Sequence, residues 1–149
     1  MNFGASFGIS ASALTAQRLR MDVISSNIAN AETTRATVVN GQAVPYKRKL
    51  VVMQSAEQNN FADMLKNKMS DQTQGVKVQS IVEDTAPLKP VYNPSHPDAD
   101  PNGYVFMPNV DITKEMVDML SAVRSYEANV TMMNASKSLV MKALEIGRQ

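Results

Sequence analysis

The last third of the chain carries the feature that most constrains its fold, a run of apolar residues at coiled-coil spacing. Residues 111 to about 146 form a predicted helix, in which apolar residues fill successive a and d positions over about five heptads. Asp111 or Thr113 can cap its first turn, and Glu115 lies close enough to favour the helix dipole. Lys137 is the one charged residue in the series. We expect it to extend into solvent, although a polar a position can also fix register. The apolar positions are Met116, Met119, Val123, Tyr126, Val130, Met133, Val140 and Leu144.

The length of this helix limits what can cover it. A helix of about 36 residues is roughly 54 Å long. A compact domain of 149 residues has a radius of gyration of only about 15 Å. The remainder of the chain therefore cannot enclose the helix, and we expect part of its apolar seam to need a neighbouring chain.

A second amphipathic helix is predicted near the N-terminus, over residues 10 to about 31. Its apolar residues recur at spacings of seven, three, four and three, as on one face of a helix. Residues 2–10 contain two glycines among small residues, and we expect them to be helical only with outside support. The apolar positions are Leu14, Met21, Ile24, Ile28 and Ala31.

Two asparagines interrupt this N-terminal helix near its end. We expect Asn30 or one of its neighbours to end the helix in the left-handed conformation, which asparagine tolerates better than most residues. Asn27 lies one turn earlier, and its amide both donates and accepts hydrogen bonds. We expect it to bridge backbone groups of a packed neighbour, so that Asn27→Ala weakens assembly more than it weakens the fold of the monomer. The C-terminal helix has a similar polar insert that includes Asn129.

The middle of the chain, residues 33–109, favours strands and loops. A hairpin is predicted at the Asn-Gly pair, Asn40 and Gly41, with the returning strand over residues 43–53. Six of the seven prolines lie in residues 87–108, which predicts an extended loop rather than the core of a sheet. Further predictions are a short helix within residues 61–68, a strand over 75–82, a turn at Asn102 and Gly103, and a short strand over 104–106.

These patterns predict an α+β fold. Long N- and C-terminal helices would form an antiparallel coiled coil, joined by a small hairpin-rich middle region with extended Pro-rich loops. The segments would be an N-terminal helix in residues 1–32, a β-rich region in 33–109 and a C-terminal helix in 110–149. Both terminal helices would contribute to one core.

Charge and composition exclude several classes of protein. A net charge of +1 makes nucleic acid and anionic membranes unsuitable partners. The chain has no cysteine and no apolar run of the roughly 18–20 residues that a membrane span requires. No positive charge precedes Arg18, so we expect no cleaved secretory signal.

Little in the sequence supports catalysis or metal binding. His96 is the one histidine, and with Asp98 and Asp100 it forms a conceivable metal site. The neighbouring prolines make local chelation awkward, so we expect a solvated loop. No nucleophile motif, phosphate-binding loop or zinc motif occurs. We therefore expect a protein that is not an enzyme and has no cofactor.

Three stretches of sequence resemble the bacterial flagellar axial proteins, the rod and hook group. Residues 14–35, LTAQRLRMDVISSNIANAETTR, contain S-x-N-I-A-N-x-x-T-T at the end of the amphipathic helix. Residues 117–146 contain R-x-Y-E-A-N, as in the C-terminal helix of that group. Residues 92–111, YNPSHPDADPNGYVFMPNVD, join a Pro-rich loop to a helix start and are similar to a proximal rod protein of the group.

This resemblance implies a structural subunit of the proximal rod of the flagellar basal body. Such a subunit would be exported through the flagellar type III apparatus without a cleaved signal and would assemble in the periplasm. Its terminal helices would pack as a coiled coil into a tubular drive shaft that transmits torque and encloses the export channel. The implied partners are other copies of the chain, the homologous rod subunits FlgB, FlgF and FlgG, the adaptor FliE and the export apparatus.

Two alternatives stay open at this level. One is another axial subunit such as FlgB, and the other is a soluble export adaptor whose coiled coil binds a partner helix transiently. In the rod interpretation, the residues expected to mediate subunit assembly are Leu14, Met21, Ile24, Asn27, Ile28, Asn30, Met116, Met119, Val123, Tyr126, Asn129, Val130, Met133, Val140 and Leu144.

Overall fold

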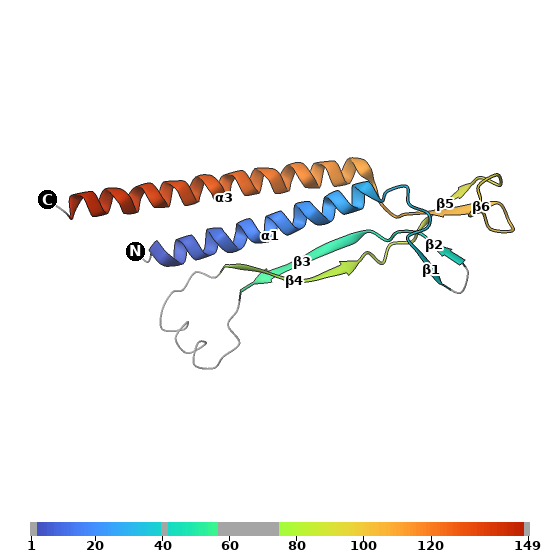
Figure 1. Ribbon diagram of the computed structural model, residues 1–149, viewed down its shortest axis with the longest axis horizontal. Coiled ribbons are helices and arrows are strands. Elements are labelled where there is room, and N and C mark those ends of the chain that lie inside the picture. The colour runs from blue at the N-terminus through green and yellow to red at the C-terminus, as the bar shows by residue number, and fades with distance from the viewer. Residues whose placement is uncertain (1–2, 40–41, 57–74, 148–149) are drawn as a thin grey trace, which may run out of the picture. The chain divides into compact units, whose positions relative to one another are not determined.

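The computed structural model describes residues 3–39, 42–56 and 75–147 (Figure 1). Within these ranges the fold is α+β, as predicted, with a helix toward each end of the chain and short antiparallel strand pairs between them. The helices are α1 (Phe3–Ala29) and α3 (Ile112–Ile146). The strands are β1 (Thr37–Val39), β2 (Gln42–Val44), β3 (Lys49–Ser55), β4 (Val76–Glu83), β5 (Lys89–Tyr92) and β6 (Tyr104–Met107).

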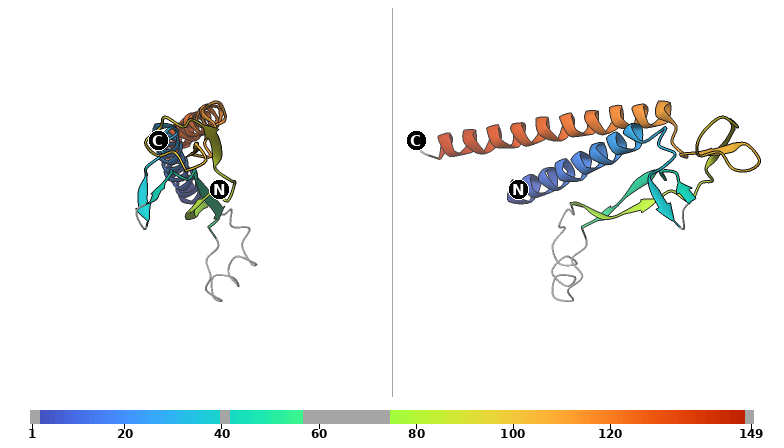
Figure 2. Two further views of the ribbon diagram at one scale, coloured as in Figure 1. Left: turned by 90° about the vertical axis from the view of Figure 1, so that its right-hand side faces the viewer. Right: turned by 45° about the vertical axis from the view of Figure 1, so that its right-hand side comes forward.

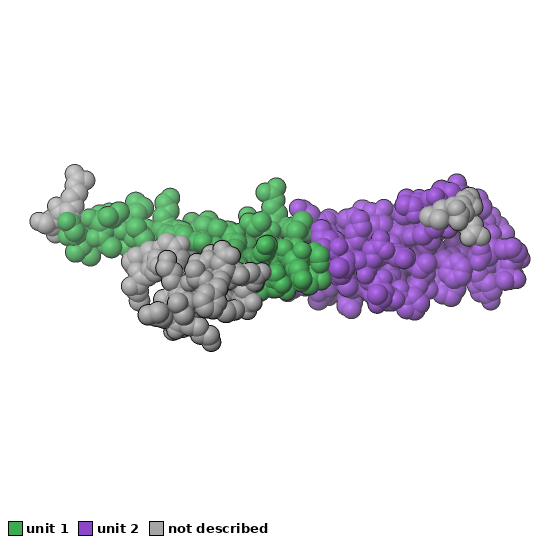
Figure 3. Space-filling model, turned by 90° about the horizontal axis from the view of Figure 1, so that it is seen from below, with its two compact units in different colours: residues 1–19, 52–80, 122–149 green, residues 20–51, 81–121 purple. Residues whose placement is uncertain are grey.

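The chain divides into two compact units (Figure 3), and each takes parts of both helices. Unit 1 comprises Met1–Leu19, Val52–Ser80 and Ala122–Gln149, and unit 2 comprises Arg20–Val51 and Ile81–Ser121. Within each unit, α1 lies between α3 and the β3–β4 ribbon (Figures 1 and 2). The units are therefore built from segments distant in sequence rather than from consecutive stretches of the chain.

The helix α1 begins earlier than the apolar spacing predicted, at Phe3 rather than near residue 10. Its C-terminal end is closed by side chains. The amide nitrogen of Asn30 donates to the Ser26 carbonyl at 2.9 Å, and the Thr33 hydroxyl donates to the Asn30 side-chain oxygen at 3.3 Å. The Ser26 carbonyl also accepts the Asn30 backbone N–H at 3.1 Å. The helix ends next to Asn30, close to the predicted position.

The helix α3 is capped by Asp111, one of the two predicted caps. The Asp111 carboxylate accepts hydrogen bonds from the backbone N–H groups of Thr113 at 3.0 Å and Lys114 at 3.3 Å. Two of the unpaired donors of the first turn are thereby satisfied. The helix then continues for 35 residues, close to the predicted length.

The hairpin β1–β2 has the predicted position, but the predicted returning strand over residues 43–53 is wrong. In the register, Val39 faces Gln42 and Thr37 faces Val44, and the turn at residues 40–41 lies outside the described residues. The strand ends at Val44 because Pro45 supplies no N–H to continue the ladder. The chain resumes at Lys49 as β3, which pairs with β4 and not with β1.

The strand β4 matches the prediction for residues 75–82, and its ribbon with β3 is anchored to α1 within unit 1. At one end of the ribbon the Ala56 N–H donates to the Gly75 carbonyl at 2.8 Å. The next N–H, that of Val76, donates instead to the Ser12 hydroxyl of α1 at 3.1 Å. The predicted short helix in residues 61–68 lies outside the described residues.

The Pro-rich segment contains more regular structure than predicted, because β5 and β6 pair within it. The register sets Pro90 opposite Phe106 and Tyr92 opposite Tyr104, and the two tyrosine rings meet edge to face at 5.4 Å. Proline is tolerated in such an edge strand because its missing N–H costs no bond there. Gly103 has a φ of 80°, as the predicted turn requires.

In unit 2 the two helices run antiparallel, the direction that the sequence predicted. Arg20 of α1 pairs with Asp118 of α3 at 3.5 Å, and Asn27 of α1 bonds to Glu115 of α3 at 3.0 Å. Ala122, at the start of the unit 1 part of α3, is fully buried. None of the described helices combines the length and apolar character needed to cross a membrane.

The turn at Gly103 generates a test of the β5–β6 hairpin. An added Cβ would lie 2.9 Å from the Tyr92 ring, and its backbone conformation disfavours any side chain. We expect Gly103→Ala to lower the free energy of unfolding by about 1–3 kcal/mol. Gly8→Ala is the control, because nothing lies within 4 Å of that position in α1, and it should raise stability by about 0.5–1 kcal/mol. Chemical denaturation measures both, and equal effects would contradict the turn geometry.

Candidate assembly site

A buried amide, that of Asn27, joins three segments of unit 2. The residue is 1% exposed, and its side chain uses both its oxygen and its nitrogen. The oxygen accepts from the Lys49 N–H at 2.9 Å and from the Tyr46 hydroxyl at 3.0 Å. The nitrogen donates to the Lys49 carbonyl at 2.9 Å and to a Glu115 carboxylate oxygen at 3.0 Å. Asn27 does bridge backbone groups, as predicted, but they belong to its own chain.

An ion pair between Arg48 and Glu115 completes this centre. Glu115 is 1% exposed, and one of its oxygens accepts from Nε of Arg48 at 2.6 Å while Nη2 lies 2.5 Å from the same oxygen. The other oxygen accepts from Asn27. A buried carboxylate is costly unless it is paired and hydrogen-bonded, and here both conditions hold. The sequence had suggested only a favourable position for Glu115 in the first turn of the helix.

Two further carboxylates lie around the Arg48 guanidinium, those of Asp84 at 3.4 Å and Asp118 at 3.6 Å. Burial opposes the charge on Arg48, but the hydrogen bonds and charges of Glu115 and Asp84 together outweigh it and raise the pKa of the guanidinium. The hydrogen bond from the Ala86 N–H lowers the pKa of the Asp84 carboxyl, and the hydrogen bond and charge of Arg48 lower it further. Arg48 thus holds the end of β4 and the start of α3 together within unit 2.

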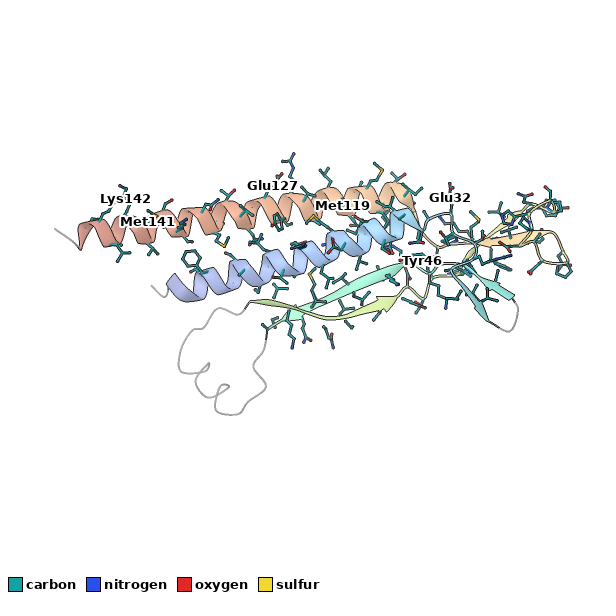
Figure 4. The ribbon with its side chains drawn as sticks, viewed as in Figure 1. Glu32, Tyr46, Met119, Glu127, Met141 and Lys142 are labelled. Carbon is teal, nitrogen blue, oxygen red and sulfur yellow. The ribbon has the colours of Figure 1, made fainter. Side chains whose placement is uncertain are left out.

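We call Asn27, Tyr46, Arg48 and Glu115 the polar junction. Tyr46, labelled in Figure 4, lies between the end of α1 and the start of β3. The backbone N–H of Arg48 also donates to the Asn109 side chain at 2.8 Å. Because each group has a directional partner, the junction fixes the register of α1 against β3 and α3. Apolar periodicity carries no signal for Tyr46 and Arg48, so sequence reasoning missed both.

The conceivable metal site in the loop at residues 96–100 does not assemble. The Asp98 carboxylate instead accepts from the Thr34 hydroxyl at 3.0 Å and pairs with Arg35, and this pairing lowers the pKa of Asp98. The His96 ring nitrogen accepts from the Asp98 backbone N–H. Across the described ranges, no three His, Cys, Asp or Glu side chains gather as a metal site would require.

Most of the residues expected to mediate assembly are half-buried. Ile24 and Asn27 are buried, and Met116 and Leu144 are exposed. Figure 4 shows Met119 on the side of α3 that faces α1. Lys137 is exposed, as expected for a side chain extending into solvent. The half-buried members are Leu14, Met21, Ile28, Asn30, Met119, Val123, Tyr126, Asn129, Val130, Met133 and Val140.

The part of α3 in unit 2 exposes an apolar row that the heptad prediction missed, apart from Met116. Ile112, Met116 and Leu120 are spaced by four residues, so they line one side of the helix, and each is exposed. Val117 lies next to the row and is 64% exposed. Monomeric proteins seldom expose contiguous apolar surface of this kind without a partner.

The part of α3 in unit 1 exposes a second apolar row. Met132, Leu139 and Ile146 are 61%, 62% and 77% exposed and recur every seven residues. The small residues Ala128 and Ala135 are exposed and fill two of the alternate positions of the same heptad line, and Lys142 fills the next. This row has the spacing of a coiled-coil seam, yet it is distinct from the half-buried seam that includes Met133 and Val140.

Comparison with known proteins places these features in a family. A model described as "Flagella basal body rod protein" matches residues 7–37, which include Asn27. A second, described as "Flagellar basal body rod FlgEFG protein C-terminal", matches residues 102–146, which include Glu115 and both exposed rows.

Several relatives are similar over nearly the whole chain, and each is named flagellar basal-body rod protein FlgC. The protein from Bacillus subtilis is 57% identical, with 96% of this chain and 97% of the relative covered. That from Borreliella burgdorferi is 44% identical, with 98% of each covered. The protein from Salmonella typhimurium is 46% identical, with 95% and 96% covered.

The polar junction changes the expected effect of Asn27→Ala. The truncation leaves the Lys49 backbone and a Glu115 oxygen without their Asn27 bonds, and leaves the Tyr46 hydroxyl with the Ser26 hydroxyl at 3.4 Å. We therefore expect a loss of about 2–4 kcal/mol in the free energy of unfolding. Asn129→Ala is the matched control in α3, since the one bond of its amide within the described residues goes to the Ser125 carbonyl one turn away. It should cost less than about 1 kcal/mol. Chemical denaturation of the purified monomers distinguishes the two, and similar losses would contradict the junction.

The lowered pKa of Asp84 predicts loss of stability in acid. A carboxyl whose pKa is lowered by folding stabilises the folded protein at pH values above its ordinary pKa, which is 3.8 for Asp84. This stabilisation is lost as the pH falls through the lower pKa of the folded protein. We expect the unfolding free energy to fall below about pH 4, and Asp84→Asn to flatten part of that fall. Urea denaturation at a series of pH values measures it. Parallel profiles for the natural chain and the variant would rule out this contribution.

Proposed function

Because the chain belongs to the FlgC family of flagellar basal-body rod proteins, we propose that α1 and α3 pack against the corresponding helices of neighbouring rod subunits. The chain is a structural subunit of the rod and not an enzyme, and its place is the flagellar basal body. The observation that carries the packing proposal is the pair of exposed apolar rows on α3.

The two rows suit helix packing in different ways. The heptad line of Met132, Leu139 and Ile146 fits a coiled-coil contact, with Ala128 and Ala135 allowing close approach of a second helix. The row of Ile112, Met116 and Leu120 follows four-residue spacing, which favours a more steeply crossed helix. Methionine adapts its shape, so such surfaces can fit neighbours that are homologous but not identical.

We further propose that the subunit belongs to the proximal rod, where it would form part of a tubular drive shaft that transmits torque and encloses the export channel. The polar junction supports a load-transmitting role, because directional buried bonds resist sliding of α1 against α3 within unit 2. Most of the residues that the sequence predicts to mediate assembly would act by packing α1 against α3. Met116 and Leu144 would contact neighbouring subunits directly.

The partners and route remain part of the proposal. They are other copies of the chain, the homologous subunits FlgB, FlgF and FlgG, and the adaptor FliE. The chain would reach the periplasm through the flagellar type III apparatus without a cleaved signal peptide. The alternatives, FlgB itself or an export adaptor, are disfavoured because relatives named FlgC match nearly the whole chain.

The heptad row generates a test of assembly. Met132→Glu combined with Leu139→Glu should leave the monomer folded, because both side chains are exposed. It should prevent rod assembly, since each apolar side chain buried in a contact is worth about 1.5–3 kcal/mol. Swimming in soft agar and electron microscopy of basal bodies, in a strain lacking the natural protein, measure the effect.

The matched control uses the residues immediately before these two in the chain. Thr131→Glu combined with Ser138→Glu places the same two charges on an exposed polar side of α3. This control should assemble and swim as the natural protein does. Normal swimming by the Met132 and Leu139 variant would refute the proposed role of the heptad row.

A further inference from the structure

We propose that Met116, Met132 and Met141 are sites of oxidation by hydrogen peroxide in the unassembled subunit, and that oxidation of Met116 and Met132 prevents assembly. The second half of this inference rests on the proposed packing of α3 against neighbours. The first half rests only on the exposure of the three side chains and can be tested separately.

The three methionines differ from others in α3 by their exposure. Met116, Met132 and Met141 are 61%, 61% and 54% exposed. Met119 and Met133 are half-buried against the rest of the chain. Met132 and Met133 are consecutive, and Met116 and Met119 are less than one turn apart. Met116 and Met132 therefore each have a more shielded methionine close by in the sequence, whereas Met141 has none.

The chemistry needs only peroxide as co-reactant. The thioether sulfur attacks one peroxide oxygen, the O–O bond breaks, and the second oxygen leaves as water after proton transfer. The sulfur loses two electrons and becomes a sulfoxide, while the peroxide is reduced. The chain has no cysteine, so no thiol competes for the oxidant. Exposure then decides which thioethers react first.

Oxidation would act directly on the two apolar rows. A sulfoxide is polar and chiral, and it disrupts surfaces that pack through methionine. Met116 lies between Ile112 and Leu120 in one row, and Met132 begins the exposed heptad line that continues at Leu139. Once packed against neighbouring helices these sulfurs would be shielded, so the sensitivity would be confined to subunits that have not assembled.

The first measurement ranks the reaction rates on the purified full chain. After timed exposure to hydrogen peroxide, trypsin should release residues 115–124, with Met116 and Met119, and residues 125–137, with Met132 and Met133. Fragment-ion mass spectrometry assigns the sulfoxide within each peptide. We expect Met116 and Met132 to react about fivefold or more faster than their partners. Equal rates within both peptides would overturn the assignment of the sites.

The second measurement is self-association by sedimentation velocity. It compares the natural chain with the triple variant Met116→Leu, Met132→Leu and Met141→Leu, each before and after peroxide. Peroxide should weaken self-association of the natural chain by about tenfold or more, with unchanged helical circular dichroism, and should leave the leucine variant unaffected.

The outcomes separate the inference from the proposed function. Unchanged association of the oxidised natural chain, equal weakening of the leucine variant, or loss of helical signal on oxidation would each overturn the inference. If neither untreated protein associates at any concentration, packing between copies fails as the basis of assembly and the effect on assembly falls with it. The assignment of the oxidation sites would then be tested by the oxidation rates within the two peptides alone.

Discussion

The contact on which unit 2 depends is the buried meeting of Asn27, Arg48 and Glu115. Removing a carboxylate and a guanidinium from water costs several kcal/mol for each ion, so such a pair persists only where geometry and extra hydrogen bonds compensate. Asn27 supplies one of these bonds and also holds the Lys49 backbone. The junction therefore specifies one arrangement of α1, β3 and α3, whereas an apolar seam alone would tolerate sliding by a turn.

The division of labour between polar and apolar contacts suits an assembling subunit. Inside unit 2, directional bonds define how the helices meet. On the outward sides of α3, by contrast, the chain exposes Met, Leu and Ile, whose contacts are non-directional and adaptable. The proposed packing against neighbouring rod subunits needs defined helix contacts within the subunit together with adaptable outward surfaces, and α3 carries both.

Apolar periodicity predicted where the helices lie, but it did not predict which of their apolar faces are covered by the same chain. The apolar heptad positions of α3 from Met119 to Val140 are half-buried, whereas Lys137 among them is exposed. Burying a continuous stripe is the main way an amphipathic helix gains stability. The outward rows, such as Ile112, Leu120 and Leu139, occupy other positions around the helix and overlap the first pattern in sequence. A single pattern cannot say which of two stripes is covered by the same chain. The strand prediction failed at Pro45 for a local reason, because proline has no backbone N–H to continue the ladder. The proline itself was visible in the sequence.

The sequence by itself determined the α+β class, both long helices, the cap at Asp111, the turn at Gly103 and membership of a flagellar rod family, because these depend on local propensity, spacing and motif. It also singled out Asn27 as a polar residue with a bridging role. Only the tertiary structure decided that this bridge closes within the chain, with Arg48, Tyr46 and Glu115 as partners. Those residues are separated from Asn27 by up to 88 positions, and no local pattern records which distant donor will meet a given buried acceptor.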